Sequence, residues 1–397
     1  MMSVVEQVWG HIHEADVADL CGALVRQPTI NPPGQEEASA QLCAEFCRRH
    51  GGEVSLLDVA PGRPNVLARF PGGQSSPALA FSGHLDVVPV SQDEQARWTH
   101  EPFGGEISGG FVWGRGSADM KGGVAAALAA IAALHASQVE LPREVWFVGT
   151  ADEEATMLGI KAIIRADVLA GVGAGVICEP TELEIAHVSK GRTWATLRVL
   201  GRTAHAALEN GGVNAIEKAR ELLDRLHESS PRFEPHPAAG RSWWRPTEIR
   251  GGIEPAIVPD RCEITLDARL VPGQSTRDLW TDVQQIIDEL EAEDPDFRCQ
   301  VEVIERREPW EVDRSAAIVE ATAAGVRAAL GKPAAFGSMM GTTDASYLVP
   351  AGVPCVVFGP GSISVVHRED ERVAVADLMA AARAYAATAL SYLGLLC

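Results

Sequence analysis

At residues 78–86 the chain reads Ala78-Leu79-Ala80-Phe81-Ser82-Gly83-His84-Leu85-Asp86, an apolar run that ends in a histidine and an aspartate. The apolar run predicts a buried strand. Residues two apart on an extended segment share a face, so Asp86 could accept a hydrogen bond from the second ring N–H of His84. Because ligands of open α/β sheets gather beyond the carboxyl ends of strands, this stretch predicts a strand with a metal-binding histidine at its end.

The segments on either side alternate between strand and helix patterns. Apolar runs predict strands at residues 65–70, 144–150 and 174–178, and helical spacing predicts helices at residues 3–25, 36–50 and 122–136 and after Glu154. Strands that alternate with helices are typical of a parallel sheet. We therefore expect the α/β class, with a mostly parallel sheet flanked by helices.

The middle of the chain has a different pattern. Alternating, β-branched segments at residues 186–200 and 248–270 predict strands, and residues 214–228 and 276–293 have the spacing of amphipathic helices. After about residue 306 the α/β pattern returns. The expected organisation is a discontinuous catalytic domain, residues 1–186 and 307–397, with an inserted α+β lid or dimerisation domain at residues 187–306.

Composition narrows the choice of partner. The 397 residues carry 34 Lys and Arg against 54 Asp and Glu, a formal net charge of -20. The phosphates of nucleic acid and of anionic membranes would be repelled by this charge, so we expect neither as a partner and favour a small molecule.

Cellular location and redox state are predicted from two further features. The longest weakly polar run, residues 122–134, is shorter than the roughly 20 residues that span a bilayer. The first 20 residues lack the basic and apolar regions of a secretory signal, so we expect a cytoplasmic protein. The eight cysteines form no CxxC pair, and we interpret them as reduced core residues.

Four more candidate ligands follow predicted strands or glycine-rich turns. They are Asp119 in a glycine-rich turn, Glu154 of the pair Glu153-Glu154, Glu179 in Cys178-Glu179-Pro180-Thr181, and His367 after the loop at residues 358–362. Each alone has an ordinary structural role, such as a helix cap or a solvated surface side chain. Together with His84 they form a nitrogen and oxygen set that suits Zn²⁺, Co²⁺ or Mn²⁺. Five ligands exceed the need of one catalytic zinc, so a two-metal site with a bridging carboxylate is predicted.

In these motifs the chain resembles the di-zinc aminoacylase and carboxypeptidase family over nearly its whole length. The matching stretches are residues 82–89, 114–123, 150–154, 178–181, 201–205 and 358–361, with His367. Residues 150–154, 213–216 and 358–363 are most similar to the branch that contains acetylornithine deacetylase and succinyl-diaminopimelate desuccinylase.

The resemblance implies a role for each residue of the site. His84 and Glu179 would hold one metal, Glu154 and His367 the other, and Asp119 would bridge the two. Asp86 would orient His84. Glu153 would be the general base, because it lies beside a ligand and is not itself used as one. The resemblance also implies a cis peptide bond between Asp119 and Met120.

Two residues of the inserted domain are candidates by the same resemblance. His205 would reach across a homodimer into the partner's active site and stabilise the oxyanion; the alternative is an ordinary surface histidine. Arg269 would bind the substrate carboxylate; the alternative is an ion pair with Asp267 or Asp260. Ala256 stands where many relatives have Asn, which leaves the substrate open. Trp243 and Trp244 are interpreted as a cap on the domain's surface rather than a pocket wall.

The predicted function is that of a homodimeric metal-dependent amidohydrolase, with two divalent ions, that removes the acyl group from a small N-acylated amino acid or related carboxylate. One alternative is a metallo-exopeptidase, and another is an amidase for a compound such as a formyl-aminopyrimidine or a xenobiotic. A binding protein without turnover is disfavoured because the predicted ligands and base are all present.

Overall fold

The computed structural model describes residues 3–209 and 211–396. Its contacts divide the chain into two units. The first unit comprises Met1–His187, Val312–Met339 and Thr343–Cys397, and the second comprises Val188–Glu311 and Met340–Thr342. The sequence analysis placed these crossings at residues 187 and 307, and it did not expect residues 340–342 in the second unit.

A nine-stranded sheet has the order β1-β2-β6-β3-β7-β15-β8-β13, with β14 paired to β8, and its strands belong to the first unit apart from β13 and the last two residues of β8. Its strands are β1 (Glu53–Ala60), β2 (Arg63–Phe70), β3 (Gln74–His84), β6 (Arg143–Thr150), β7 (Val172–Ile177), β8 (Ile185–Ser189), β13 (Trp310–Glu311), β14 (Phe336–Met339) and β15 (Cys355–Val357). The four central strands β6, β3, β7 and β15 are parallel, whereas β1, β2 and β13 pair antiparallel at the margins. The predicted α/β class with a parallel central sheet is confirmed.

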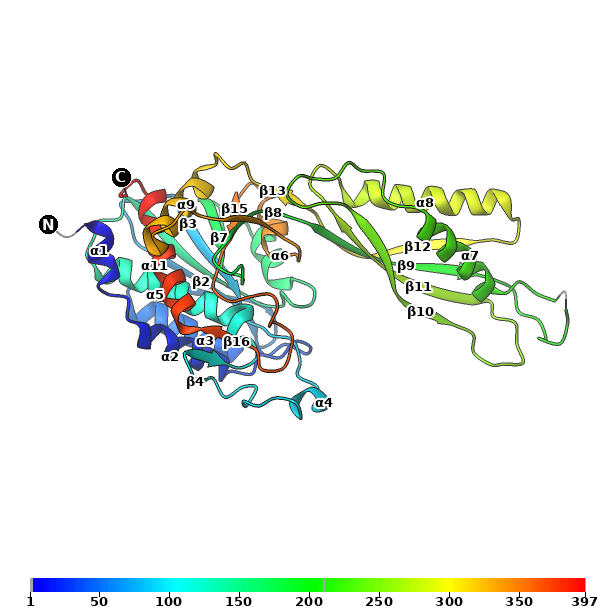
Figure 1. Cartoon of the computed structure of the whole chain (residues 1–397), viewed down its shortest axis with the longest axis horizontal. Coiled ribbons are helices and arrows are strands. Elements are labelled where there is room, and N and C mark those ends of the chain that lie inside the picture. Colours follow the sequence, from blue (N-terminus) through cyan, green and yellow to red (C-terminus); the bar gives the residue numbers. More distant parts are fainter. Residues whose placement is uncertain (1–2, 210, 397) are drawn as a thin grey trace. The chain divides into compact units, whose positions relative to one another are not determined.

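Helices α2, α5, α9 and α11 pack against one another beside this sheet (Figure 1). The helices of the unit are α1 (Val4–Trp9), α2 (Glu14–Val25), α3 (Glu37–Arg49), α4 (Gln92–Gln95), α5 (Gly122–Ala136), α6 (Leu158–Arg165), α9 (Ala317–Leu330), α10 (Ala345–Leu348) and α11 (Val375–Tyr392). A small sheet has the order β16-β5-β4, formed by β16 (Arg372–Ala374), β5 (Phe111–Trp113) and β4 (Glu106–Ser108).

One of the predicted helices is divided in the structure. The single helix expected at residues 3–25 is two, because a Ser3 capping box begins α1 and Gly10 ends it. The helix predicted at residues 122–136 is confirmed as α5, and the turn before it extends its apolar window. Residues Ser117–Ala136 are long and apolar enough to cross a membrane, but 89% of that window is buried inside the fold, which is typical of a core helix.

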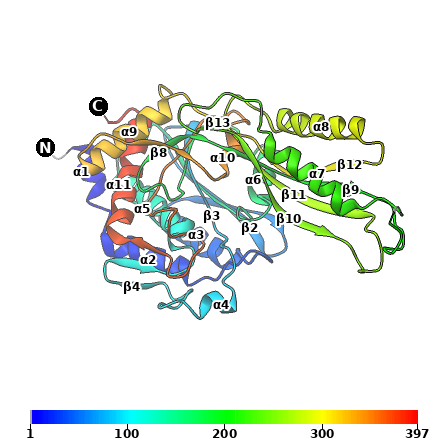
Figure 2. The same cartoon turned by 45° about the vertical axis from the view of Figure 1, so that its right-hand side comes forward.

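The second unit is a four-stranded antiparallel sheet of order β10-β11-β9-β12 with two helices. Its elements are β9 (Gly191–Leu200), α7 (Ala215–Glu228), β10 (Trp243–Gly251), β11 (Arg261–Leu270), α8 (Thr276–Glu293) and β12 (Cys299–Arg307). Burial alternates strictly along β9 and β11, and the buried set, such as Leu197 and Leu266, packs with residues of α7 and α8. Figure 2 shows both helices on one side of the strands. Trp243 and Trp244, interpreted as a cap on the domain's surface, begin strand β10, and Trp244 packs against this core.

Candidate metal centre

The parallel strands of the first unit bring the predicted ligands to one edge of the sheet. In register, His84 at the end of β3 pairs with Thr150 at the end of β6, and Ser82 pairs with Ile177 at the end of β7. The segments that carry Glu154 and Glu179 therefore leave the sheet beside His84. This common edge is the place where the sequence analysis expected the site.

Asp119 lies in a π-type turn (Ser117–Lys121) that leads into α5, and the peptide bond to Met120 is cis, as expected. Its two carboxylate oxygens face different histidines. Oδ1 is 3.0 Å from Nε2 of His84, and Oδ2 is 3.3 Å from Nε2 of His367. A carboxylate with one oxygen directed to each of two candidate ligand histidines has the arrangement that a bridging ligand would need.

The other carboxylates complete two groups around Asp119. Oε1 of Glu179 lies 3.8 Å from Nε2 of His84, and Oε1 of Glu154 lies 3.0 Å from Nε2 of His367. Potential ligand atoms of His84, Asp119 and Glu154 all lie within 4.8 Å of one another, as do those of His84, Glu153 and Glu179. The structure thus brings all five predicted ligands and the predicted base together.

The electrostatics of the cluster are those of a site for cations. Burial, followed by the charge of Asp119, raises the pKa of Glu179 well above its usual value, and the same two causes raise the pKa of Glu154. Hydrogen bonds to Asp119 and Glu154 raise the pKa of His367 to about 10. Several buried carboxylates this close repel one another unless cations neutralise them. The nitrogen and oxygen donors therefore fit divalent metal ions.

Asp86 makes different contacts from those expected. Nδ1 of His84 lies 3.0 Å from the backbone carbonyl oxygen of Asp86 and 3.7 Å from its carboxylate. The carboxylate instead accepts hydrogen bonds from Nδ2 of Asn31 at 2.8 Å and from the backbone N–H groups of Glu153 and Glu154, each at 3.1 Å. Asp86 therefore orients His84 through its main chain and the two glutamates through its side chain.

Glu371 holds the turn that presents Asp119, and the sequence analysis missed it. Its buried carboxylate accepts hydrogen bonds from the backbone N–H groups of Gly116 at 2.9 Å, and of Ala118 and Asp119 at 3.1 Å each. Arg115 donates to the same carboxylate at 2.7 Å. No motif pointed to Glu371, because its partners, three main-chain N–H groups and Arg115, all lie more than 250 residues away in the sequence.

A second network holds the loop that carries the two glutamates. The Arg63 guanidinium binds the carboxylates of Glu36 at 2.5 Å and of Asp152 at 2.8 Å. Asp152, which has a positive φ, also accepts from the backbone N–H of Thr156 at 3.1 Å. The turn before and after Glu153 is thus fixed by buried ion pairs rather than by regular structure.

His205 and Arg269 belong to the second unit. His205 is exposed in a loop, and its Nδ1 accepts from the backbone N–H of Ala207 at 3.1 Å. Arg269, on β11, pairs with Asp267 through two contacts, Nε to Oδ1 at 3.0 Å and Nη2 to Oδ2 at 3.1 Å. The ion pair that the sequence analysis kept as the alternative for Arg269 is present.

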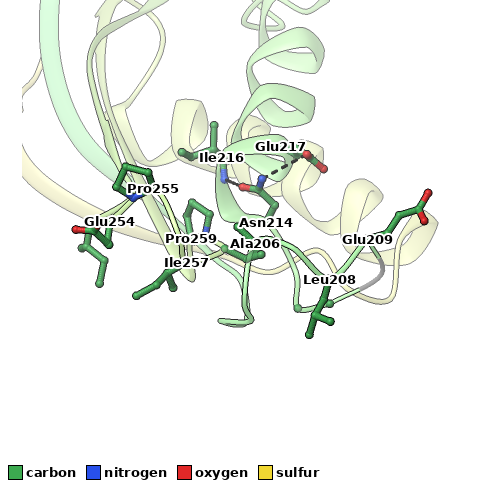
Figure 3. A pocket seen from close by; sticks show the side chains of 15 residues that line it. Ala206, Leu208, Glu209, Asn214, Ile216, Glu217, Glu254, Pro255, Ile257 and Pro259 are labelled. Atoms are coloured by element: carbon green, nitrogen blue, oxygen red, sulfur yellow. Dashed lines mark hydrogen bonds between the residues drawn. The ribbon is translucent and has the colours of Figure 1, made fainter.

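A cavity of about 830 Å³ lies close to the His205 loop in the second unit. It is lined by residues between 206 and 217 and by residues 252–255 and 257–259, and Figure 3 shows Ala206, Leu208, Ile257 and Pro259 along it. Ala256, which replaces the expected Asn, accepts from the backbone N–H of Ala206 at 3.0 Å through its own carbonyl group. This contact does not require the Asn side chain.

Comparisons with known proteins agree on the family. The profile of "Peptidase family M20/M25/M40" matches residues 80–391. The N-formyl-4-amino-5-aminomethyl-2-methylpyrimidine deformylase of Halalkalibacterium halodurans is 28% identical, with 95% of both chains covered. The acetylornithine deacetylase of Myxococcus xanthus is 31% identical over 82% of this chain and 83% of its own. The structure of aminopeptidase PepT from Bacillus cereus has a TM-score of 0.79 at 20% identity, covering 97% of this chain and all of PepT, a likeness of fold.

Proposed function

The chain belongs to peptidase family M20/M25/M40, and from that premise we propose that it removes the acyl group from a small N-acylated amino acid or a related carboxylate. Membership confirms the family that the motifs indicated and makes the chain a hydrolase of amide bonds. Relatives named as deacetylase, desuccinylase and deformylase all cleave an acyl group from nitrogen, which supports this reaction.

The observation that carries the proposal is the position of Asp119 between His84 and His367, with one oxygen toward each. His84 and Glu179 would hold one divalent ion, Glu154 and His367 a second, and Asp119 would bridge them. Two such ions, zinc or else cobalt or manganese, would polarise the amide carbonyl and make water a better nucleophile.

Glu153 is proposed as the general base. It is 6% exposed and lies with His84 and Glu179, and its backbone N–H is fixed by Asp86. Its carboxylate would take a proton from the attacking water and return it to the leaving nitrogen, so that a free amine and a carboxylic acid result. Asp86 thus holds Glu153 through its main chain, beside the predicted ligands His84 and Glu179.

A second candidate is an amidase for a substrate without an α-carboxylate. The deformylase from Halalkalibacterium halodurans covers 95% of this chain, and its name gives an aminopyrimidine as substrate. Arg269, the expected carboxylate ligand, is engaged by Asp267. A metallo-exopeptidase would use the same ions and base and would differ in the substrate that it accepts.

The test of the main proposal is hydrolysis by zinc- or cobalt-loaded protein of N-acetyl, N-succinyl and N-formyl amino acids, dipeptides and non-amino-acid amides, with a chelated control. Turnover of N-acyl amino acids that the chelator abolishes is expected. Glu153→Ala should keep its metal and lose at least about a hundredfold in kcat, because the base is removed. Activity confined to dipeptides or to the formyl-pyrimidine would contradict the main proposal, and full activity in Glu153→Ala would contradict the base.

We also propose that the enzyme is a cytoplasmic homodimer joined through the second unit. The surface near His205 carries exposed apolar side chains, among them Leu208 at 60% and Ile253 at 84% exposure, and such patches are typical of interfaces. The formal net charge of the whole chain, -20, supports a small-molecule substrate over nucleic acid or membrane.

Light scattering tests the dimer. The expected mass is twice the 42.3 kDa of one chain, and Leu208→Glu should give monomers because it places a charge in an apolar interface. Ile107→Glu, at a similarly exposed apolar residue of the first unit, is the control and should stay dimeric. A monomer with full activity would contradict both the dimer and the role proposed for His205.

A further inference from the structure

Two segments that carry candidate metal ligands start from the same pair of strands in the first unit. β5 and β16 pair antiparallel, and the pairing continues beyond them because the backbone N–H of Gly114 donates to the carbonyl oxygen of Glu371 at 2.8 Å. The chain that leaves β5 leads to Asp119, and the chain that enters β16 comes from His367. The turn that carries Asp119 and the loop that carries His367 are therefore attached to each other beside these strands.

Arg115 connects the turn and the loop a second time, through its side chain. The residue is 1% exposed, and its Nη1 donates to Oε2 of Glu371 at 2.7 Å and to the carbonyl oxygen of Arg368 at 3.2 Å. The other oxygen of Glu371, Oε1, accepts from the backbone N–H of Asp119 at 3.1 Å. Because Arg368 follows His367 directly, the Arg115–Glu371 pair contacts the main chain at or beside each of two candidate ligands.

The charges of the Arg115–Glu371 pair make its geometry hard to change. Nη2 of Arg115 lies 2.5 Å from Oε1 of Glu94, so that one guanidinium group lies between two carboxylates. The centroid of the Trp98 ring lies 5.5 Å from the same guanidinium. Glu371 is fully buried, and a buried charge that loses its partner is strongly destabilising. Arg115 and Glu371 therefore cannot separate without leaving an unpaired charge in the protein interior.

The other candidate ligands are placed by a different part of the fold. His84 ends β3 and Glu179 follows β7, and these strands are joined by the ladder of the main sheet. We call the ion proposed at these two residues the first ion, and the ion proposed at Glu154 and His367 the second ion. His367 lies in a loop, and its side chain is 46% exposed. Its position 3.3 Å from Asp119 thus depends on the contacts between the loop and the turn.

We infer that Arg115 and Glu371 are positioning residues for the second ion. The inference rests on the proposed function for the presence of two ions. Neither residue is a proposed ligand, and the pair acts on the main chain of Asp119 and of the residue after His367, so that it fixes how these two ligands face each other. The first ion keeps two ligands that the sheet places, so its affinity should depend less on the pair.

Titration of the zinc-loaded protein with a chromogenic chelator tests the inference, because it measures a Kd for each ion and needs no substrate. His367→Ala identifies the Kd that belongs to the second ion. In Glu371→Gln, Oε1 can still accept from the turn, but the new NH₂ group faces Nη1 of Arg115 and the ion pair is lost. The Kd of the second ion should rise about tenfold or more, and that of the first ion should stay within about threefold.

Arg115→Lys is the second variant, and it keeps the positive charge. An ammonium group is a compact charge without the planar fork of a guanidinium, so it cannot reproduce the contacts with both carboxylates and with the carbonyl oxygen. The Kd of the second ion should again rise about tenfold or more. The matched control is Arg143→Lys, because Arg143 donates to the carbonyl oxygen of Tyr392 at 2.6 Å and begins β6, whereas the candidate ligands lie beyond the other end of that strand.

The outcomes separate a positioning role from a merely structural one. Thermal unfolding shows whether each variant is folded, and Arg115→Lys decides the inference if Glu371→Gln does not fold. Equal changes in both Kd values, a change confined to the first ion, or Kd values equal to those of Arg143→Lys would overturn the inference, as would a wild-type protein that holds fewer than two zinc ions. A chain that turns over no amide contradicts the proposed function, whereas the two Kd values still decide the role of Arg115 and Glu371.

Discussion

At the scale of single residues, Asp86 links the two halves of the metal centre. Its carbonyl oxygen lies against Nδ1 of His84, and its carboxylate accepts from the backbone of Glu153 and Glu154. Asp86→Asn keeps the size of the side chain but turns an amide NH₂ toward a backbone N–H, so that one of these donors loses its acceptor. We expect metal affinity or kcat to fall between about tenfold and a hundredfold, as for other partners of ligand residues. The loss is measured as the metal content after dialysis and as kcat, with a variant of the half-buried Asp58, Asp58→Asn, as control. An Asp86→Asn protein with the metal content and kcat of that control would refute the linking role.

Asp86 also shows which contacts of the site can be predicted from the sequence and which cannot. Spacing along an extended segment correctly predicted that Asp86 and His84 would be close, because the pleat has a period of two. It could not tell which oxygen of Asp86 would be the acceptor, since that depends on Asn31 and on the backbone of Glu153, which come from other segments. Glu371 was not predicted for the same reason: apart from Arg115, its partners are main-chain N–H groups of a distant segment, and these have no signature in the amino-acid sequence.

At the scale of elements, the start of α5 is packed directly against the segment that carries Glu179. A Cβ at Gly123 would overlap the backbone carbonyl of Cys178, so only glycine allows this approach. Gly123→Ala should lower stability by about 1–3 kcal/mol through overpacking and displace Glu179, so that metal affinity falls as well. Thermal unfolding and metal titration measure the two effects. Gly10→Ala, whose nearest neighbour would be a carbonyl oxygen at 3.4 Å, is the control, and equal behaviour of the two variants would contradict the packing argument.

Elements also show why the helices were easier to predict than their ends. The long apolar runs of α5 and α11 are covered on several sides and leave a clear pattern. The break between α1 and α2 depends on a cap at Ser3 and a stop at Gly10, which are single residues within a continuous helical periodicity. In β12 the register shifts between Val303 and Glu305, and a one-residue irregularity of this kind is not visible in the alternation of a sequence.

At the scale of the whole molecule, the candidate metal centre belongs to the first unit alone, so the two units should respond differently to loss of metal. His84, Asp119 and Glu179 are all within the first unit, which has its own sheet and core. The second unit has a separate core around Leu266. Calorimetry should therefore resolve two unfolding transitions, of which only the one from the first unit depends on metal.

Removal of metal by a chelator should lower the midpoint temperature of the first unit's unfolding transition by at least about 5 °C. An ion whose free concentration is a hundred times its Kd adds about 2.7 kcal/mol to the free energy of unfolding. The midpoint temperature of a domain of this size shifts by roughly 2–4 °C for each kcal/mol. The carboxylates of Asp119, Glu154 and Glu179 add to the effect, because they repel one another once the ions are gone. Leu266→Ala is the converse control: it should lower only the second transition, by the 2–5 kcal/mol typical of a buried leucine. If metal removal and Leu266→Ala both shift one single transition, the two units unfold together. The metal ions would then stabilise the whole chain rather than the first unit alone.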